Sequence, residues 1–204
     1  MADNVTIPTQ GTGDSTPVVA TDDVSGAHYQ KVKLVDGTAD SSTAIPGSGD
    51  GLHIKTHSTI VDLTLSLDTG IYADGDVLAA AQELASAVRS NGATGVLQSI
   101  YVIDKDDQGM AFDIVVADQT IALGTENSPV SISDADAAKI LGIISISSGD
   151  YVDLVNSQAV TMSGLGLVLK PSGASTSVYI GAISRGTGTY TASGIVLRFG
   201  IVQD

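Results

Sequence analysis

Residues 95–116, GVLQSIYVIDKDDQGMAFDIVV, decide the fold class that this chain should adopt. Two apolar runs, 95–103 and 110–116, are rich in valine and isoleucine, which favour extended backbone. Between them lies the acidic, glycine-ended loop Asp104–Gly109. Two such runs joined by a short polar loop are typical of a β-hairpin, and we expect these two strands to pair with each other.

Similar strand signals recur along the rest of the chain from about residue 52. They are short runs of alternating or continuous apolar residues, bounded by glycine-rich turns, at 60–67, 142–147, 151–154, 165–170, 177–183 and 194–202. Many short strands with turn residues between them indicate an all-β sandwich or barrel.

Two segments carry helix signals. Ser133 followed by acidic residues resembles an N-cap with a favourable first turn, and the alanine-rich run to Leu141 ends at Gly142. This pattern predicts one short helix. Residues 76–89 combine alanines of high helix propensity with apolar positions that fit neither period, so helix and strand both stay open there.

Composition excludes several classes of function. The chain has 204 residues, a formal charge of −14 and 9 basic side chains, too few for a protein that binds a phosphate backbone. No apolar run is long enough to span a bilayer, and the first residues do not resemble a secretory signal. With no cysteine, disulfides, thiolate zinc sites and cysteine nucleophiles are excluded. We expect no membrane partner and no nucleic-acid partner.

The first fifty residues differ from the rest. Residues 1–50 are rich in polar residues and read as an extended arm with a flexible linker, and 51–204 read as the β-sandwich body. Within the arm, 28–35 alternate like a half-buried strand, with Val32 and Leu34 on one face. An isolated strand is unstable, so this one should pair with a sheet edge of its own body or of a neighbour.

Enzyme motifs are weak in this sequence. Asp68-Thr69-Gly70 follows an apolar strand as in aspartic proteases, but such a site needs two carboxylates, and Ile71 stands where the protease string continues with alanine or serine. The same tripeptide is good turn chemistry. We therefore expect no catalytic residue.

Metal motifs are equally weak. The loop from Asp104 has a glycine at the sixth position of a calcium loop, but Val115 falls where the bidentate glutamate belongs, so a solvated hairpin tip is favoured. His53 and His57 share a sheet face if extended, but zinc needs three or four ligands. We expect no metal site and no cofactor.

The segment 26–38, GAHYQKVKLVDGT, resembles an N-terminal block of tailed-bacteriophage virion proteins. The body is similar to such proteins at 72–77 (YADGDV), at 95–99 with 106–109, and at 183–187 (ISRGT). The similarity is strongest to capsid decoration or head-surface proteins. It implies a jelly-roll-like β-sandwich, a homotrimer, and a non-enzymatic structural role on the capsid surface of a virion made in the host bacterial cytoplasm.

The resemblance and the strand pattern together predict a partner-binding segment. We expect the arm to tether the protein to the major capsid protein or to another virion protein through Tyr29, Lys31, Val32, Lys33, Leu34 and Val35. The alternative is a tail-fibre, baseplate or spike component that binds a host receptor or glycan. The scarcity of aromatic side chains, 4% of the chain, favours the structural role.

Overall fold

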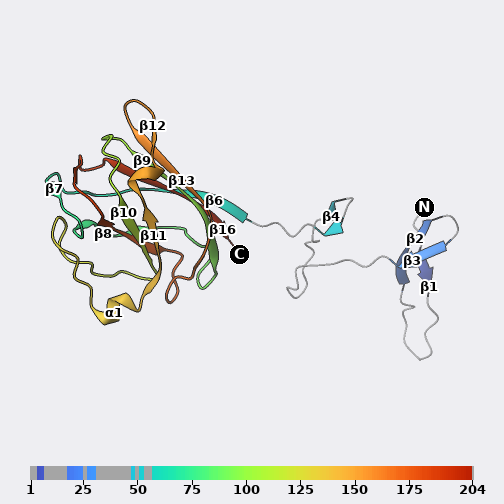
Figure 1. The fold of residues 1–204 in the computed structure, drawn as a ribbon. Helices are drawn as coiled ribbons and strands as arrows, with labels where there is room; N and C mark the ends of the chain where they lie inside the picture. The colour runs from blue at the N-terminus through green and yellow to red at the C-terminus, as the bar shows by residue number, and fades with distance from the viewer. Residues whose placement is uncertain are drawn as a thin grey trace. The chain divides into compact units, whose positions relative to one another are not determined.

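The structure is a computed structural model that describes residues 4–6, 18–24, 27–30, 47–48, 51–52 and 57–203 (Figure 1). The chain divides into two compact units, Met1–Lys55 and Thr56–Asp204. Each unit is described by itself below.

The first unit contains short antiparallel strands. β2 (Val18–Val24) pairs on one side with β1 (Asn4–Thr6) and on the other with β3 (Ala27–Gln30). A second pair joins β4 (Gly47–Ser48) to β5 (Gly51–Leu52). Of the predicted attachment residues, Tyr29 falls in the backbone of β3, and Lys31, Val32, Lys33, Leu34 and Val35 lie outside the described residues.

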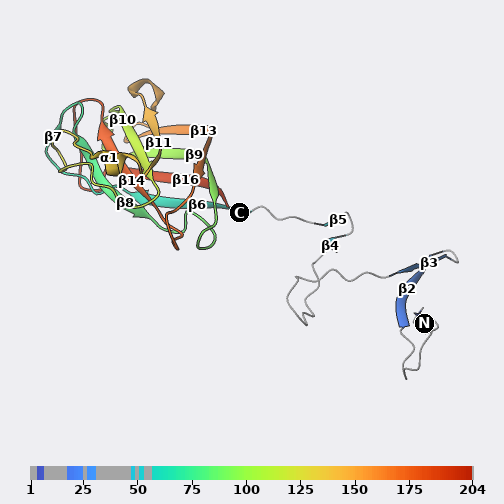
Figure 2. The ribbon, with the colours of Figure 1, turned by 90° about the horizontal axis from the view of Figure 1, so that it is seen from below.

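The second unit is a two-layer β-sandwich (Figures 1 and 2). One sheet has the order β12-β13-β9-β16-β6 and the other the order β11-β10-β14-β8. The long strands are β6 (His57–Thr64), β8 (Val77–Leu84), β9 (Gly95–Asp104), β10 (Phe112–Ala117), β11 (Ile140–Ile146), β13 (Gln158–Leu169), β14 (Val178–Ser184) and β16 (Ile195–Gln203). The short ones are β7 (Ile71–Tyr72), β12 (Val152–Asp153) and β15 (Gly188–Thr189).

The connections between the long strands define the fold. Successive long strands alternate between the two sheets, except that β10 and β11 are neighbours in one sheet. Eight antiparallel strands wound into two facing sheets in this way form a jelly roll. The predicted all-β sandwich of jelly-roll type is therefore confirmed.

The predicted hairpin of β9 with β10 is wrong. β9 pairs with β13 and β16, and β10 pairs with β11 and β14, so the two strands belong to opposite sheets. The loop Asp104–Gly109 carries the chain across the sandwich instead of turning it back. Apolar periodicity identifies a strand, but it contains no information on which strand will be its neighbour.

The core between the sheets is aliphatic and contains both phenylalanines of the chain. Phe112 comes from the four-stranded sheet and Phe199 from the five-stranded sheet, and each is fully buried. Around them pack leucine, isoleucine and valine side chains from both sheets. This single core holds the two layers together, because each inner face can be buried only against the other.

A second apolar cluster covers the outer face of the four-stranded sheet. Ile121 and Leu123, from the long connection between β10 and β11, pack on Val77, Val115 and Ile183 of that sheet. Strand β10 is therefore buried on both faces along its whole length. The apolar run at 114–117 has this cause, since a strand covered on both sides loses the usual polar alternation.

The segment 76–89, for which the sequence leaves helix and strand open, is extended. It forms β8 at one edge of the four-stranded sheet, and its first three residues are buried. Helix propensity favours alanine by only a fraction of a kcal/mol per residue, and pairing with β14 outweighs it.

The predicted short helix is present but shorter than expected. α1 spans Asp134–Ala137, and the Ser133 hydroxyl caps it by accepting the Asp136 N–H at 3.1 Å. The Lys139 ammonium bonds the Asp136 carboxylate at 2.8 Å and lowers its pKa. Contrary to the prediction, Ile140 and Leu141 already belong to β11, because pairing with β10 extends that strand toward the helix.

The β12–β13 hairpin ends in a strained apolar tip. Val152, Leu154 and Val155 are all exposed, and Val155 has a φ of 78°. The Asp153 carboxylate holds this turn by accepting the Val155 N–H at 2.6 Å. A β-branched residue in the left-handed region costs roughly 1–2 kcal/mol, because its Cβ crowds the following carbonyl oxygen.

Replacing Val155 with asparagine should therefore stabilise the body. Asparagine tolerates positive φ, so we expect the free energy of unfolding to rise by about 0.5–1 kcal/mol. Urea unfolding followed by circular dichroism measures the change. The control is Val152→Asn, a neighbouring exposed valine without positive φ. Equal effects of the two substitutions would show that the left-handed backbone of Val155 is not the source of strain.

Candidate functional site

Several carboxylates of the described residues, among them Asp68, Asp104 and Asp106, serve as structural acceptors. Asp104 is fully buried at the end of β9, and its carboxylate accepts three backbone N–H groups. The donors are Asp106 at 3.0 Å, Gln108 at 2.9 Å and Gly109 at 2.8 Å. Within the described ranges, no three His, Cys, Asp or Glu side chains lie together as metal ligands would.

The rest of this acidic loop binds another loop of the body. The Asp106 carboxylate accepts the Thr191 N–H at 2.7 Å and its hydroxyl at 2.9 Å, and the Lys105 ammonium donates to the Ser193 carbonyl at 2.9 Å. The loop is exposed at Lys105, Asp107 and Gln108, as expected of a solvated loop, but it is not the tip of a hairpin. The loop is a structural clamp where the chain passes from one sheet to the other.

Asp68-Thr69-Gly70, the one protease-like string, forms a turn. Asp68 Oδ1 accepts the Gly70 N–H at 2.6 Å and the Asn127 amide at 3.0 Å, so its neighbour is an amide and not a second carboxylate. The buried Tyr72 hydroxyl accepts the Asp68 N–H at 2.7 Å, and burial raises the pKa of Tyr72 to about 12. The geometry is that of an anchored turn.

The three histidines lie in different parts of the chain. His57 opens β6 and is exposed; His28 lies in the backbone of β3, and His53 lies outside the described residues.

Most body tyrosines are committed to packing. Tyr72 and Tyr190 are buried with ring centroids 6.5 Å apart, and the Tyr151 hydroxyl donates to the Met110 carbonyl at 3.0 Å. Burial raises the pKa of Tyr151 and of Tyr190 above that of a free phenol. A glycan site usually needs exposed aromatic rings, and the packing of these three leaves few for that purpose.

The outer face of the five-stranded sheet differs from that of its partner sheet. No described segment packs across it as Ile121 and Leu123 do on the other side. Burial alternation and strand register assign its outward side chains, which are Ser58, Ile60, Asp62 and Thr64 of β6, Val196, Arg198, Gly200 and Val202 of β16, Val96, Ser99, Tyr101 and Ile103 of β9, and Thr161, Ser163 and Val168 of β13.

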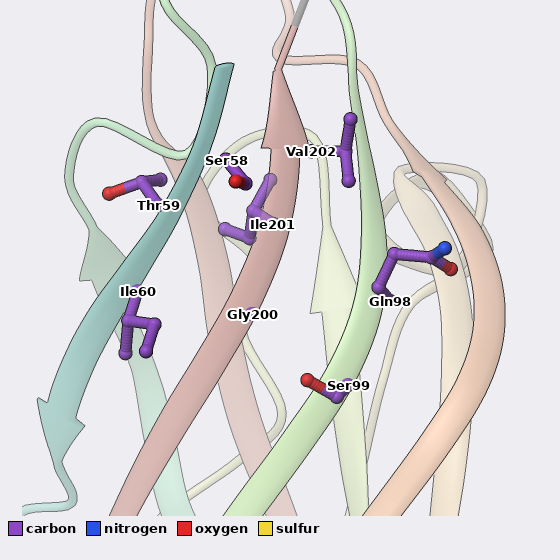
Figure 3. A pocket seen from close by; sticks show the side chains of 8 residues that line it. All are labelled: Ser58, Thr59, Ile60, Gln98, Ser99, Gly200, Ile201 and Val202. Carbon is purple, nitrogen blue, oxygen red and sulfur yellow. The ribbon is translucent and has the colours of Figure 1, made fainter. Parts of the chain in front are cut away.

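A trough crosses this face where one row of neighbours is small. The register places Ile60 beside Gly200, Gly200 beside Ser99, and Ser99 beside Ser163. A Cβ at Gly200 would overlap the Ser99 hydroxyl in its present rotamer, so glycine keeps this position open. We call this row, with the hollow above it, the trough. Figure 3 shows the Ser99 side chain directed from β9 toward β16, with Ile60 on β6 at the side.

The trough is bounded on the β6 side by the projecting side chain of Ile60. A hollow of about 360 Å³ is lined by residues of β6, β16 and β9, and a second of about 210 Å³ adjoins it along Tyr101 and Arg198. At the β6 end stands Ile60, whose side chain is 66% exposed. The Arg198 guanidinium bonds the Asp62 carboxylate at 2.9 Å across the neighbouring row.

Charge distinguishes this face from the rest of the body. Residues 57–203 contain 15 acidic and 6 basic side chains, but the face carries only Asp62, which Arg198 neutralises. The face therefore has no net charge, and it combines a hollow with an exposed isoleucine. It is suited to docking of another macromolecule.

None of the trough residues is among the residues predicted to bind a partner. The sequence pattern at 194–202 does indicate an uncharged outer face on this strand. Valines and glycine occupy the positions between the core residues there, and only one of those positions is charged. The predicted binding residues all belong to the first unit. Among these residues, the structure describes only Tyr29, and only its backbone.

Comparisons with known proteins give little further information. No protein-family model and no curated protein sequence matches the chain. Among solved structures, the infectious bursal disease virus VP2 subviral particle is similar with a TM-score of 0.26 and 9% identity, over 94% of this chain and 48% of that one. The structure of the Gt strain of that virus gives 0.20 and 11%, over 95% and 50%. The chain spans about half the length of these proteins, and TM-scores this low do not establish a shared fold.

Within the described part of the chain, no helix is long and apolar enough to cross a bilayer.

Proposed function

We propose that this protein is a non-enzymatic structural component of a bacteriophage particle that decorates or stabilises the capsid surface as a homotrimer. The observation that carries the proposal is the jelly-roll body, whose acidic side chains serve as caps and turn anchors. Jelly rolls are common in viral capsid proteins and in lectins. The resemblance of residues 26–38 and of the body segments to phage virion proteins favours the first of these.

Charge supports an outward-facing position on the particle. A body with 15 acidic and 6 basic side chains is repelled by packaged DNA and stays soluble at high copy number. The packing of Tyr72, Tyr151 and Tyr190 against the body leaves few aromatic rings for a glycan site. This favours the capsid role over a receptor-binding tail fibre or spike.

We further propose that residues 1–50 are the tether. Within 28–35, Val32 and Leu34 share one face, and a strand with that alternation can add to a sheet edge of the major capsid protein or of another virion protein. Backbone hydrogen bonds would provide affinity, and the two apolar side chains would provide specificity.

The tether is tested in the full chain by replacing Val32 and Leu34 together with aspartate. Burying two unpaired carboxylates is strongly unfavourable, so we expect binding to particles that lack the protein to fall at least about 100-fold. Sedimentation of the protein with purified particles measures the occupancy. Unchanged occupancy would exclude this strand as the tether.

The control carries the same charge change outside the strand. Ser41→Asp with Thr43→Asp lies in the predicted linker and should leave occupancy near that of the wild type. Electron microscopy of virions with the protein labelled tests location directly. Label on the head supports capsid decoration, and label confined to the tail would support the fibre or baseplate alternative.

A further inference from the structure

The two sheets of the body are covered unequally. The chain covers part of the outer face of the four-stranded sheet itself, with Ile121 and Leu123 packed on Val115, and leaves Ile143 57% exposed on the edge strand β11. On the five-stranded sheet, Ile60 stays 66% exposed and Val168 55% exposed. An outer sheet face in contact with water normally carries polar side chains in alternation with the core residues. This face carries polar side chains together with valines and isoleucines, among them Ile60 and Val168, and these exposed apolar side chains form surface that a partner can bury.

The face carries both a projecting apolar side chain and a hollow. Ile60 projects from the edge strand β6, and the trough at Gly200 and Ser99 lies beside it on the same face. A second copy of the chain would bring an isoleucine to fill the trough and a trough to receive Ile60. In symmetric assemblies, a contact of this kind forms between one patch and its copy or between two patches of successive copies.

The charge of the face also fits a second copy. Residues 57–203 carry a formal charge of −9, so two copies repel each other over most of their surface. The face is neutral, and its one ion pair places a cation, Arg198, beside an anion, Asp62. A contact between two such faces therefore adds no net like-charge repulsion, unlike a contact between other parts of the acidic surface.

We propose that the outer face of the five-stranded sheet is the contact between copies of this chain, with Ile60 of one copy seated in the trough of another. The inference deepens the proposed function, because it rests on the homo-oligomer stated there. It identifies the surface through which the copies associate, and that surface is distinct from the arm that tethers the protein to the particle.

The test is the solution mass of the full-length protein over a range of concentrations, measured by analytical ultracentrifugation. The wild type should be an oligomer. Ile60→Asp should raise the dissociation constant at least about 100-fold, because a carboxylate would be buried in an uncharged trough. Ile60 is largely exposed in the monomer, so thermal unfolding of the monomeric variant should show a folded body.

A matched control separates this contact from a general effect of added charge. Ile71, on the short strand β7, is 67% exposed and lies outside the face. Ile71→Asp adds the same charge and should leave the mass unchanged. A second variant, Ser99→Leu, fills the trough without adding charge and should also favour the monomer, since it removes the space for Ile60.

Four results would overturn the inference. Three of them are a monomeric wild type, an oligomer that survives both Ile60→Asp and Ser99→Leu, and equal dissociation by Ile71→Asp. Loss of particle binding by Ile60→Asp without a change in mass would also overturn it, because the face would then dock on another virion protein. The labelled virion tests the capsid role separately, so failure of one proposal can be told from failure of the other.

Discussion

Replacing Phe199 with alanine should lower the free energy of unfolding of the body by about 4 kcal/mol, the largest effect we expect of any single substitution considered. Phe199 lies in β16, between β6 and β9, and its ring is fully buried in the main core. Truncation removes the transfer free energy of the ring and leaves a cavity that neighbouring strands cannot collapse to fill.

Thermal unfolding followed by circular dichroism measures this change. For a body of this size, about 4 kcal/mol corresponds to a fall in Tm of about 8–16 °C. Phe199→Leu keeps much of the volume and should cost less than half as much. Val168→Ala, at a site 55% exposed, is the control and should change stability by less than about 0.5 kcal/mol. Similar losses for Phe199→Ala and Val168→Ala would mean that Phe199 is not a core residue.

Replacing Asp104 with alanine should cost about 3 kcal/mol. Its buried carboxylate accepts backbone N–H groups of Asp106, Gln108 and Gly109, and a hydrogen bond to a charged group contributes about 1.5–3 kcal/mol. Alanine would leave all three donors without that acceptor. The three bonds are not additive, because part of the loop can turn toward water once the carboxylate is gone.

Urea unfolding of matched variants tests the role of Asp104. Asp104→Asn retains one carbonyl oxygen and should fall between the wild type and Asp104→Ala. Asp74→Ala removes an exposed acidic side chain of another loop and serves as the control for charge. If Asp104→Ala and Asp74→Ala unfold at the same urea concentration, the carboxylate does not organise the crossing between the sheets.

Local pattern was sufficient to predict the class of the fold and most of its strands. The runs at 142–147, 177–183 and 194–202 correspond closely to β11, β14 and β16, because short apolar runs bounded by glycine have few other ways to bury their surface. The cap at Ser133 was also visible in the sequence, since an N-cap is formed by residues close to one another in the chain.

Pairing of the strands could not be predicted in the same way. The residues of β9 and β10 read as a hairpin, but Asp104 folds the loop between them so that the second strand enters the other sheet. The hydrogen bonds that the Asp104 carboxylate accepts form only where the tertiary structure has placed this loop. The spacing of residues along the sequence does not specify that placement.

The outer face of the five-stranded sheet could likewise be predicted only in part from the sequence. Periodicity marks Ile60 and Gly200 as positions between core residues, but they come from strands that are far apart in the sequence and adjacent in the sheet. Composition and alternation determined that this chain folds as an all-β sandwich with an acidic surface, because those properties follow from each segment alone. Tertiary structure decided which strands are neighbours, which sheet the chain covers itself, and that the uncharged residues gather on one open face. These depend on contacts between distant segments, and each is selected by the burial of the whole core.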